Sequence, residues 1–504
     1  MDRSGIIAMV DGENKNWINT LPNCILSHIL SFLTIKDAVD TCMLSHQWRH
    51  LWNHPILTRP NLEFDIPNIF GGKYDQLFEQ HEEYIYNPLI YQFERQCFVR
   101  RVDEFLLLFH GNKVDSFKVA FFLGAESTAI LDKWVHFAIT KGAQALDLQL
   151  SCHRIDTLET ESVYVFPHWI LSDLKSSTLK HLSLQRCVLK PPTDYFDRFI
   201  QLTTLCLYKV NVDPVFLAHL FSSCSPLESL TLRCCRVGSY LVIGPSLGLK
   251  DLKVLECIDL EKVEIDAVNL SSLEYSGNHL EISCMRTPQL VRYFYSGMSE
   301  GALPYVLTQL ASCLGLETLH LQIWDNLGDI PQTVSTFRNL KQVNLDLFVP
   351  NFDLGSVVNI LKAAPLLEEF VVTVQPASYQ GDVRSVSGFS HGHLRKFKMQ
   401  GFQGKWIEIE LAICILKIAT KLEVLVIDPY GKSYNGGGSW TEINCCSYME
   451  GYEKEVVDED EENIVLCGVE DAVDLNYLYW KQRGSVVVRQ RLKEVMTDAE
   501  VVIL

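Results

Sequence analysis

The sequence predicts an α/β fold: a small helical unit, then a solenoid in which each repeat has a strand and a helix or loop, then a C-terminal cap. Three observations predict it. Two apolar helical patterns occupy residues 21–52, a short leucine motif recurs through the middle of the chain, and the motif stops near residue 430. The chain has 504 residues, of which 47% are hydrophobic and 21% charged, so we expect most of it to bury a core.

The helical unit is expected over residues 16–56, after a flexible tail at 1–15. Pro22 suits the first turn of a helix, and the apolar residues that follow make one wide apolar face. Thr34 is placed to cap a second helix, with Asp37 three residues on. Two short helices cannot bury so much apolar surface between themselves, so the unit either binds a partner or caps the first repeat. The residues expected on this surface are Leu21, Pro22, Ile25, Leu26, Ile29, Leu30, Leu33, Val39, Leu44, Trp48, Leu51 and Trp52.

Residues 57–113 mix prolines and glycines with a charged aromatic stretch. We interpret them as a linker followed by a helix that packs on the first repeat.

The repeats are expected over residues 114–393. Leu179, Leu182, Leu184, Cys187 and Leu189 fit the pattern L-x-x-L-x-L-x-x-C-x-L, and copies of it mostly begin 20 to 28 residues apart. This spacing is that of leucine-rich repeats. Leucines at period two face inward together, and the next repeat covers them. The cysteine position needs a small side chain in the turn, which explains Cys187, Cys235 and Cys257 without catalysis or metal binding.

The last repeats are expected over 394–430, and residues 431–504 break the pattern. "GKSYNGGGSW" is interpreted as a flexible, turn-rich segment, and residues 453–463 as an acidic loop. "WKQRGSVVVRQRLKEV" predicts a helix, and "AEVVIL" predicts a last strand that closes the open edge of the solenoid.

Composition and motifs argue against several classes of function. The net charge of −18 disfavours nucleic acid and anionic membranes. No apolar run is long enough to span a bilayer, and residues 1–16 lack the basic start and long apolar centre expected of a secretory signal. We therefore expect a cytosolic or nuclear protein whose 16 cysteines are thiols. "GKS" at Gly431 lacks the earlier glycine of a phosphate-binding loop, and no HExxH occurs. We expect no catalysis, no metal and no cofactor.

The N-terminal stretch "LPNCILSHILSFLTIKDAVDTCMLSHQWRHLW" resembles the F-box along its whole length. The Leu-Pro start, the I-L-x-x-I-L core, the C-x-L-S segment and the W-R-x-L-W end all match. The resemblance implies a helical hook that docks on a Skp-type adaptor, and through it on a cullin–RING ubiquitin ligase. One departure is the pair His46-Gln47, where many relatives have two basic residues; this puts the strength of the adaptor contact in doubt.

A second stretch, Leu394 to Pro429, is similar to the FBD motif, which accompanies F-boxes and leucine-rich repeats in a large plant family. Together the resemblances imply the substrate receptor of a Skp–cullin–F-box ubiquitin ligase. Two alternatives stay open: a scaffold that binds the adaptor but delivers no substrate, and a decoy that binds targets without assembling a ligase.

The target is expected on the concave surface of the repeats, where the side chains beside the core leucines lie. These positions mix polar and aromatic residues, as suits a protein-binding face, and we expect most of them to be ordinary solvated positions. The candidate residues are His181, Gln185, Tyr208, Arg233, Lys253, Arg292, Phe294, His320, Lys396 and Lys398.

Overall fold

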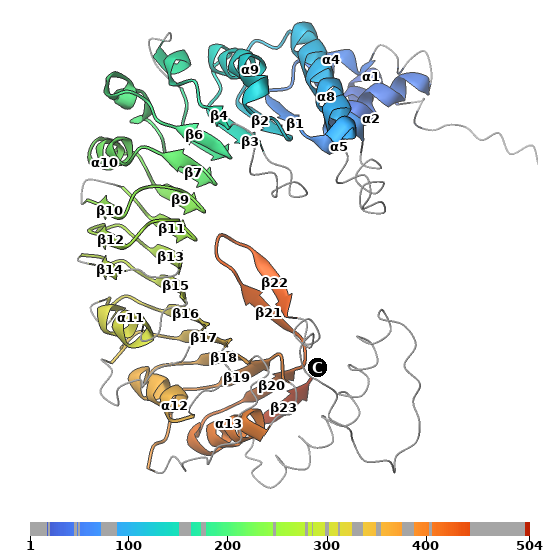
Figure 1. Cartoon of the computed structure of the whole chain (residues 1–504). Helices are drawn as coiled ribbons and strands as arrows, with labels where there is room; N and C mark the ends of the chain where they lie inside the picture. Colours follow the sequence, from blue (N-terminus) through green and yellow to red (C-terminus); the bar gives the residue numbers. More distant parts are fainter. Residues whose placement is uncertain are drawn as a thin grey trace, which may run out of the picture. The chain divides into compact units, whose positions relative to one another are not determined.

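The leucine motifs form parallel strands in a computed structural model of the chain (Figure 1). The chain divides into two units, Met1–Val188 and Leu189–Leu504. The structure describes residues 18, 21–44, 48, 51–71, 88–150, 163–172, 178–244, 248–277, 281–284, 286–297, 302–310, 313–324, 336–348, 354–374, 388–402, 406–443 and 499–504.

The first unit begins with the predicted helices. Thr34 Oγ1 accepts the backbone N–H of Asp37 at 3.0 Å, so the predicted cap of the second helix is confirmed. Leu26 and Leu30 are fully buried on the side of the first helix that packs against a later helix. The elements are α1 (Asn23–Ser31), α2 (Ile35–Asp40), the 3-10 turn η2 (Thr41–Met43) and α4 (Asn53–Leu57).

A strand and a helix lie where the sequence predicted the start of a linker. β1 (Asn61–Phe64) pairs in parallel with β2 (Ser116–Ala120), and α5 (Ile66–Phe70) packs against α2. Leu62 and Phe64 point into the core in the same alternation as the later repeats. The linker prediction is therefore wrong for these residues, because two buried side chains at period two are enough to add a strand to the sheet.

The remaining first-unit elements build on this sheet in the order β1-β2-β3-β5, with β3 at Ala145–Gln149 and β5 at His181–Gln185. A long helix, α8 (Pro88–Leu108), packs beside α9 (Thr128–Thr140). Trp134 Nε1 donates to the Asp103 carboxylate at 2.8 Å, and the Phe98 ring stacks on Phe121 at 4.2 Å. Short elements complete the unit: η3 (Ala125–Ser127), β4 (Tyr164–Val165), η4 (His168–Ser172) and the start of β6 (Cys187–Leu189).

The second unit is a stack of parallel strands in which the core leucines are in register. Leu205 lies opposite Leu230, and Leu230 lies opposite Leu252, so each repeat covers the leucines of the one before it. The strands are, in sheet order, β7 (Thr204–Tyr208), β9 (Ser229–Arg233), β11 (Asp251–Leu255), β13 (Ser272–Gly277), β15 (Arg292–Gly297), β16 (Thr318–Ile323), β17 (Gln342–Leu347), β18 (Glu369–Val374), β19 (Lys396–Gln400), β20 (Val424–Asp428) and β23 (Glu500–Ile503).

Helices and short strands cover one face of this stack (Figure 1). We call the opposite face, which carries the side chains between the core leucines, the concave face. The covering elements are η5 (Thr193–Phe199), β8 (Asn211–Val212), α10 (Pro214–Ser223), β10 (Tyr240–Ile243), β12 (Lys262–Ile265), β14 (Glu281–Cys284), α11 (Ala302–Leu310), α12 (Leu354–Ala363) and α13 (Trp406–Ile418).

The turns after the strands explain the cysteine position. Lys209 and Glu256 each follow a strand with φ of +53°, in the left-handed region, so the chain bends sharply there. The next residue of the motif enters the core, and Cys187 and Cys235 are buried as predicted. Cys235 Sγ donates to the Leu207 carbonyl oxygen at 3.3 Å.

The C-terminal elements differ from the sequence prediction at one place. β23 lies where a last strand was predicted, and it pairs in parallel with β20. "GKSYNGGGSW" was predicted to be flexible, but it forms the antiparallel hairpin β21 (Gly431–Tyr434) and β22 (Trp440–Ile443). The predicted acidic loop and the predicted helix that follows it lie outside the described residues.

Candidate functional site

Exposed apolar side chains lie on α1, on η2 and on Leu44, which directly follows η2. Ile25, Ile29 and Phe32 fall at i, i+4 and i+7, so they share the side of α1 that faces away from the core. The side chain of Phe32 is 76% exposed. Met43 and Leu44 are 88% and 68% exposed. Surfaces of this kind in a small helical unit are typical of protein–protein contacts.

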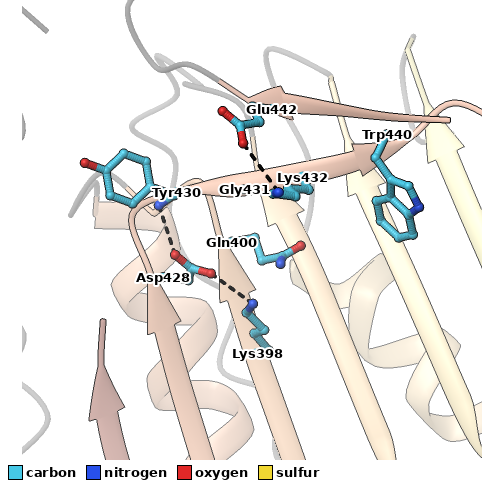
Figure 2. Close-up of a pocket in the computed structure, with 8 residues that line it drawn as sticks. All are labelled: Lys398, Gln400, Asp428, Tyr430, Gly431, Lys432, Trp440 and Glu442. Carbon is cyan, nitrogen blue, oxygen red and sulfur yellow. Dashed lines mark hydrogen bonds and ion pairs between the residues drawn. The ribbon is translucent and has the colours of Figure 1, made fainter. Parts of the chain in front are cut away.

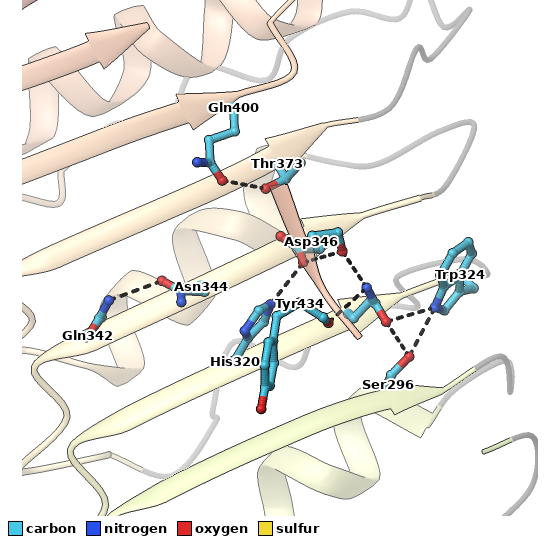
Figure 3. A network of polar contacts seen from close by, with 11 residues as sticks. Ser296, His320, Trp324, Gln342, Asn344, Asp346, Thr373, Gln400 and Tyr434 are labelled. Atoms are coloured by element: carbon cyan, nitrogen blue, oxygen red, sulfur yellow. Dashed lines mark hydrogen bonds and ion pairs between the residues drawn. The ribbon is translucent and has the colours of Figure 1, made fainter. Parts of the chain in front are cut away.

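The concave face of the second unit changes character along the stack. In β7 and β9, buried leucines alternate with partly exposed residues, so one face is covered. In β15 and β16, five of six residues are buried, so both faces are covered. The hairpin β21–β22 causes this difference, because it lies over the concave face of these strands (Figures 1 and 3).

Hydrogen bonds fix the first strand of the hairpin to the middle of the stack (Figure 3). Ser433 Oγ donates to Asp346 Oδ2 at 3.0 Å and accepts from Gln322 Nε2 at 2.6 Å. The same Asp346 oxygen lies 2.9 Å from His320 Nε2, and Gln322 Oε1 accepts from Ser296 at 2.6 Å. These side chains are buried, so satisfied hydrogen bonds are needed to keep the hairpin in place.

The glycine-rich tip of the hairpin is held by a buried carboxylate. Glu274 on β13 accepts from Tyr434 Oη at 2.9 Å and from the Gly437 backbone N–H at 2.5 Å, and it pairs with Lys253 Nζ at 3.0 Å. Burial lowers the pKa of Lys253, but the hydrogen bond and charge of Glu274 outweigh that effect and raise it. Three donors therefore compensate the carboxylate, which makes this cluster an anchor of the hairpin.

Comparison with known proteins identifies two parts of the chain. A family model described as the F-box domain matches residues 18–60, and one described as At1g61320/AtMIF1, LRR domain, matches residues 107–465. The chain belongs to the plant F-box/leucine-rich-repeat family.

Similar proteins are named for the F-box, and some of them also for leucine-rich repeats. The chain is 24% identical over 383 residues to the F-box/FBD/LRR-repeat protein At1g13570 of Arabidopsis thaliana, which covers 72% of this chain and 77% of the relative. It is also 24% identical over 345 residues to the F-box protein At5g03100 of Arabidopsis thaliana, covering 66% of this chain and 90% of the relative. The α/β fold predicted from the sequence, a helical F-box followed by a repeat solenoid, is confirmed.

The predicted adaptor-binding residues of this F-box/leucine-rich-repeat protein divide into three groups. Leu26, Leu30 and Trp48 are buried in the F-box itself, so they support the surface from within. Leu21, Leu33, Leu51 and Trp52 are partly exposed, whereas Pro22, Ile25, Ile29, Val39 and Leu44 are exposed. His46-Gln47, the departure from the F-box pattern, lies outside the described residues.

The sequence reasoning missed two of the most exposed apolar residues as site residues, Phe32 and Met43. The helical period could have found Phe32, which follows Ile29 by three positions and Ile25 by seven. Met43 lies in the 3-10 turn η2, where the α-helical period does not apply.

The predicted target-binding residues also divide. Phe294 and His320 are buried under the hairpin, where the Tyr434 ring lies 5.0 Å and 5.8 Å from their rings. Their placement on an open concave face is therefore corrected, because a distant segment covers them. His181, Arg292 and Lys396 are exposed, and Gln185, Tyr208, Arg233, Lys253 and Lys398 are partly exposed.

The hairpin itself was missed, although its sequence carries a signal. Asn435 precedes three glycines, and Asn-Gly between two short segments is typical of a β-hairpin turn. All three glycines have positive φ, which side chains with a Cβ adopt at a cost.

The thiols of the repeats show structural rather than reactive surroundings. Burial raises the pKa of Cys235 to about 11 and that of Cys257 to about 12. Within the described part of the chain, no group of three or more histidine, cysteine or acidic residues is arranged to hold a metal ion. None of the described helices is long and apolar enough to cross a membrane.

Proposed function

We propose that the chain is the substrate-recognition subunit of a Skp–cullin–F-box ubiquitin ligase. The F-box binds the Skp-type adaptor, and the repeat unit binds a target protein. The chain performs no bond chemistry itself and acts in the cytoplasm, the nucleus or both. This proposal rests on the F-box match at residues 18–60 and on the apolar surface that the F-box exposes.

Within the structure, the observation that carries the proposal is the exposure of Phe32, Met43 and Leu44. Burying a large apolar side chain contributes about 1.5–3 kcal/mol. Side chains of this kind supply much of the free energy of a specific contact once a partner covers them.

The contribution to ubiquitin transfer is positional. A receptor that holds the adaptor at one end and a target at the other raises the effective concentration of target lysines near a ubiquitin-charged enzyme. The F-box lies in the first unit together with the target-binding candidates His181 and Gln185. The other candidates lie in the second unit, so substitutions there test target binding without touching the F-box.

The target surface is proposed on the part of the concave face that the hairpin leaves accessible. Tyr208 and Arg233 are neighbours there, with the guanidinium 5.6 Å from the ring centroid. Tyrosine and arginine are enriched where interfaces gain most of their binding free energy. Further candidates are Arg292 and Lys396 in the same unit, and His181 and Gln185 on β5 of the first unit.

The proposal is tested by measuring the affinity of the full chain for a purified Skp-type adaptor by calorimetry. The double variant Phe32→Asp, Leu44→Asp places charge on the exposed surface without entering the core. We expect it to lose about a hundredfold or more in affinity. Leu30 is unsuitable for this purpose, because it is fully buried and its substitution by aspartate would unfold the F-box.

The matched control is Val215→Asp, an equally drastic change at a 61% exposed valine on α10 of the second unit. It should bind the adaptor like the unmodified chain. If the unmodified chain does not bind the adaptor, the ligase proposal fails and a decoy that only binds targets is favoured. If the adaptor binds but no target is turned over in cells, a scaffold is favoured.

A further inference from the structure

The hairpin β21–β22 and the ends of β19 and β20 line an open pocket of about 570 Å³ in the second unit (Figure 2). Pockets of roughly 300–1,000 Å³ are the usual size of small-ligand sites in proteins, so this one has room for a large side chain. We call it the anchor pocket. It lies beside the strands that the hairpin covers, so it exists only while the hairpin is in place.

The charged groups of the anchor pocket are already compensated. Lys398 Nζ pairs with Asp428 at 2.9 Å, and that carboxylate also accepts the Tyr430 backbone N–H at 3.0 Å. Lys432 pairs with Glu442 at 3.4 Å across the hairpin. The four charges sum to zero. The Lys398 and Asp428 side chains are only 23% and 13% exposed, so a charged ligand group that competed for one of them would leave the other poorly compensated, at a cost in free energy. An uncharged group would leave that pair intact.

Two exposed aromatic rings form the apolar part of the pocket. Tyr430 and Trp440 lie on opposite sides of it, and they are 52% and 58% exposed (Figure 2). The Trp440 ring rests 4.9 Å from Tyr434, which Glu274 holds in place. Aromatic rings that are oriented in advance lose little conformational entropy on binding and are common where interfaces gain most of their free energy.

A peptide suits the edge of the pocket. β22 contributes Trp440 and Glu442, and among the described residues it pairs only with β21. The second edge of such a strand offers backbone N–H and C=O groups to an extended peptide, while a neighbouring pocket selects a side chain.

We propose that the anchor pocket receives one uncharged aromatic or large aliphatic side chain of the target, presented by an extended peptide along β22. The assignment of the ligand as a target peptide rests on the proposed function, whereas the existence of the pocket does not. It narrows the class of target: the recognised segment carries an exposed apolar residue rather than a charged or phosphorylated one.

The test uses the full chain and saturation-transfer NMR with capped amino acids. We expect N-acetyl-tryptophanamide to bind more tightly than N-acetyl-lysinamide or the capped amide of glutamate. Trp440→Ala and Tyr430→Ala should each weaken binding about two- to tenfold, since an aromatic contact contributes on that scale. A glycine–serine peptide with one central tryptophan should bind more tightly than the capped amino acid.

The control variant is Tyr240→Ala, which removes another exposed ring of the second unit, on β10. It should leave binding unchanged. Hydrogen exchange over residues 431–443 verifies that the hairpin stays docked in each variant. If Trp440→Ala loosens the docked hairpin, the result for Tyr430→Ala decides the test. Equal binding of the lysine probe, or unchanged binding in Tyr430→Ala, would overturn the proposal.

Adaptor affinity, measured on the same variants, separates this inference from the proposed function. The pocket residues lie in the second unit and the F-box in the first. A chain that binds the tryptophan probes but no adaptor would overturn the ligase role and leave the peptide pocket standing. A chain that binds the adaptor but none of the probes would overturn the pocket alone.

Discussion

His391 shows, at the scale of one residue, how a polar side chain is used inside the repeats. It is buried, and its Nδ1 accepts the Leu394 backbone N–H at 3.1 Å. Its Nε2 lies 3.0 Å from the Ala364 carbonyl oxygen. A carbonyl can only accept and an amide N–H can only donate, so the ring is neutral with its proton on Nε2. Burial is the main reason that the pKa of His391 is lowered from its usual value.

This environment predicts a pH dependence. Because the pKa of His391 is lower in the folded protein than in the unfolded chain, the unfolded chain binds the proton more readily below about pH 6.5. The stability due to the neutral ring is fully present above that pH and is lost as the pH falls. We expect the unmodified chain to lose up to about 1 kcal/mol more than His391→Gln between pH 7.5 and 5.5. Denaturant unfolding at both pH values measures this difference; equal losses in the two proteins would contradict it.

The hairpin β21–β22 decides the character of the concave face at the scale of an element. Its contacts reach residues 87 to 163 positions away in the sequence. They bury Phe294 and His320, which would otherwise lie on an open surface. Part of the concave face that the repeat pattern predicts as a binding surface is therefore covered by the hairpin.

One glycine at the hairpin tip should control this docking. A Cβ on Gly436 would lie 2.8 Å from Leu255 Cδ2, closer than van der Waals contact allows. Gly438 has a similar φ, +84° against +82°, but nothing lies within 4 Å of its Cβ position. The two substitutions by alanine therefore share the backbone strain and differ in the steric clash.

We expect Gly436→Ala to undock the hairpin and Gly438→Ala to leave it docked. Overpacking costs about 1–3 kcal/mol, so amide exchange over residues 431–443 should rise about tenfold or more in Gly436→Ala relative to Gly438→Ala. Hydrogen exchange with mass spectrometry measures it. Equal exchange in both variants would mean that the Leu255 contact does not hold the tip.

At the scale of the whole molecule, stacking of repeats leaves strands that need a covering partner. β23 lies beside β20, with Val501 opposite Leu425 and Ile503 opposite Ile427. Its apolar side chains are half-buried, and those of Leu425 and Ile427 are fully buried. Repeat proteins depend on such covering elements for solubility.

Removal of residues 499–504 should therefore destabilise the second unit. Half-burial of three apolar side chains contributes about 3 kcal/mol in total, and the exposed edge of β20 would favour association between chains. Thermal unfolding and light scattering measure the two effects. The F-box should still bind the adaptor, since it lies in the first unit; an unchanged melting temperature would show that β23 adds nothing to the stack.

Features that depend on residues close together in the sequence could be predicted. Leu182 and Leu184 are two positions apart, so one strand places both in the core. Thr34 caps a helix whose first turn it adjoins, and Cys187 fills the turn of its own repeat. The F-box was recognisable for the same reason, because its apolar residues recur within some thirty positions.

The sequence could not predict in the same way which apolar residues of the F-box are buried and which are exposed. Ile25 and Leu26 are adjacent and both apolar, and the helical pattern alone puts them on one wide face. The position of α4, which is not encoded in α1, buries Leu26 and leaves Ile25 exposed.

The sequence alone determined the repeat period, the inward leucines, the F-box and the family, because each rests on short-range spacing of side chains. Only the tertiary structure decided which apolar residues face outward and which part of the concave face is open. Those outcomes depend on segments that meet across long stretches of chain, as Ser433 meets Asp346 and Tyr434 meets Glu274. The burial of a side chain depends on the surface that covers it. A local sequence pattern does not specify which distant segment provides that surface.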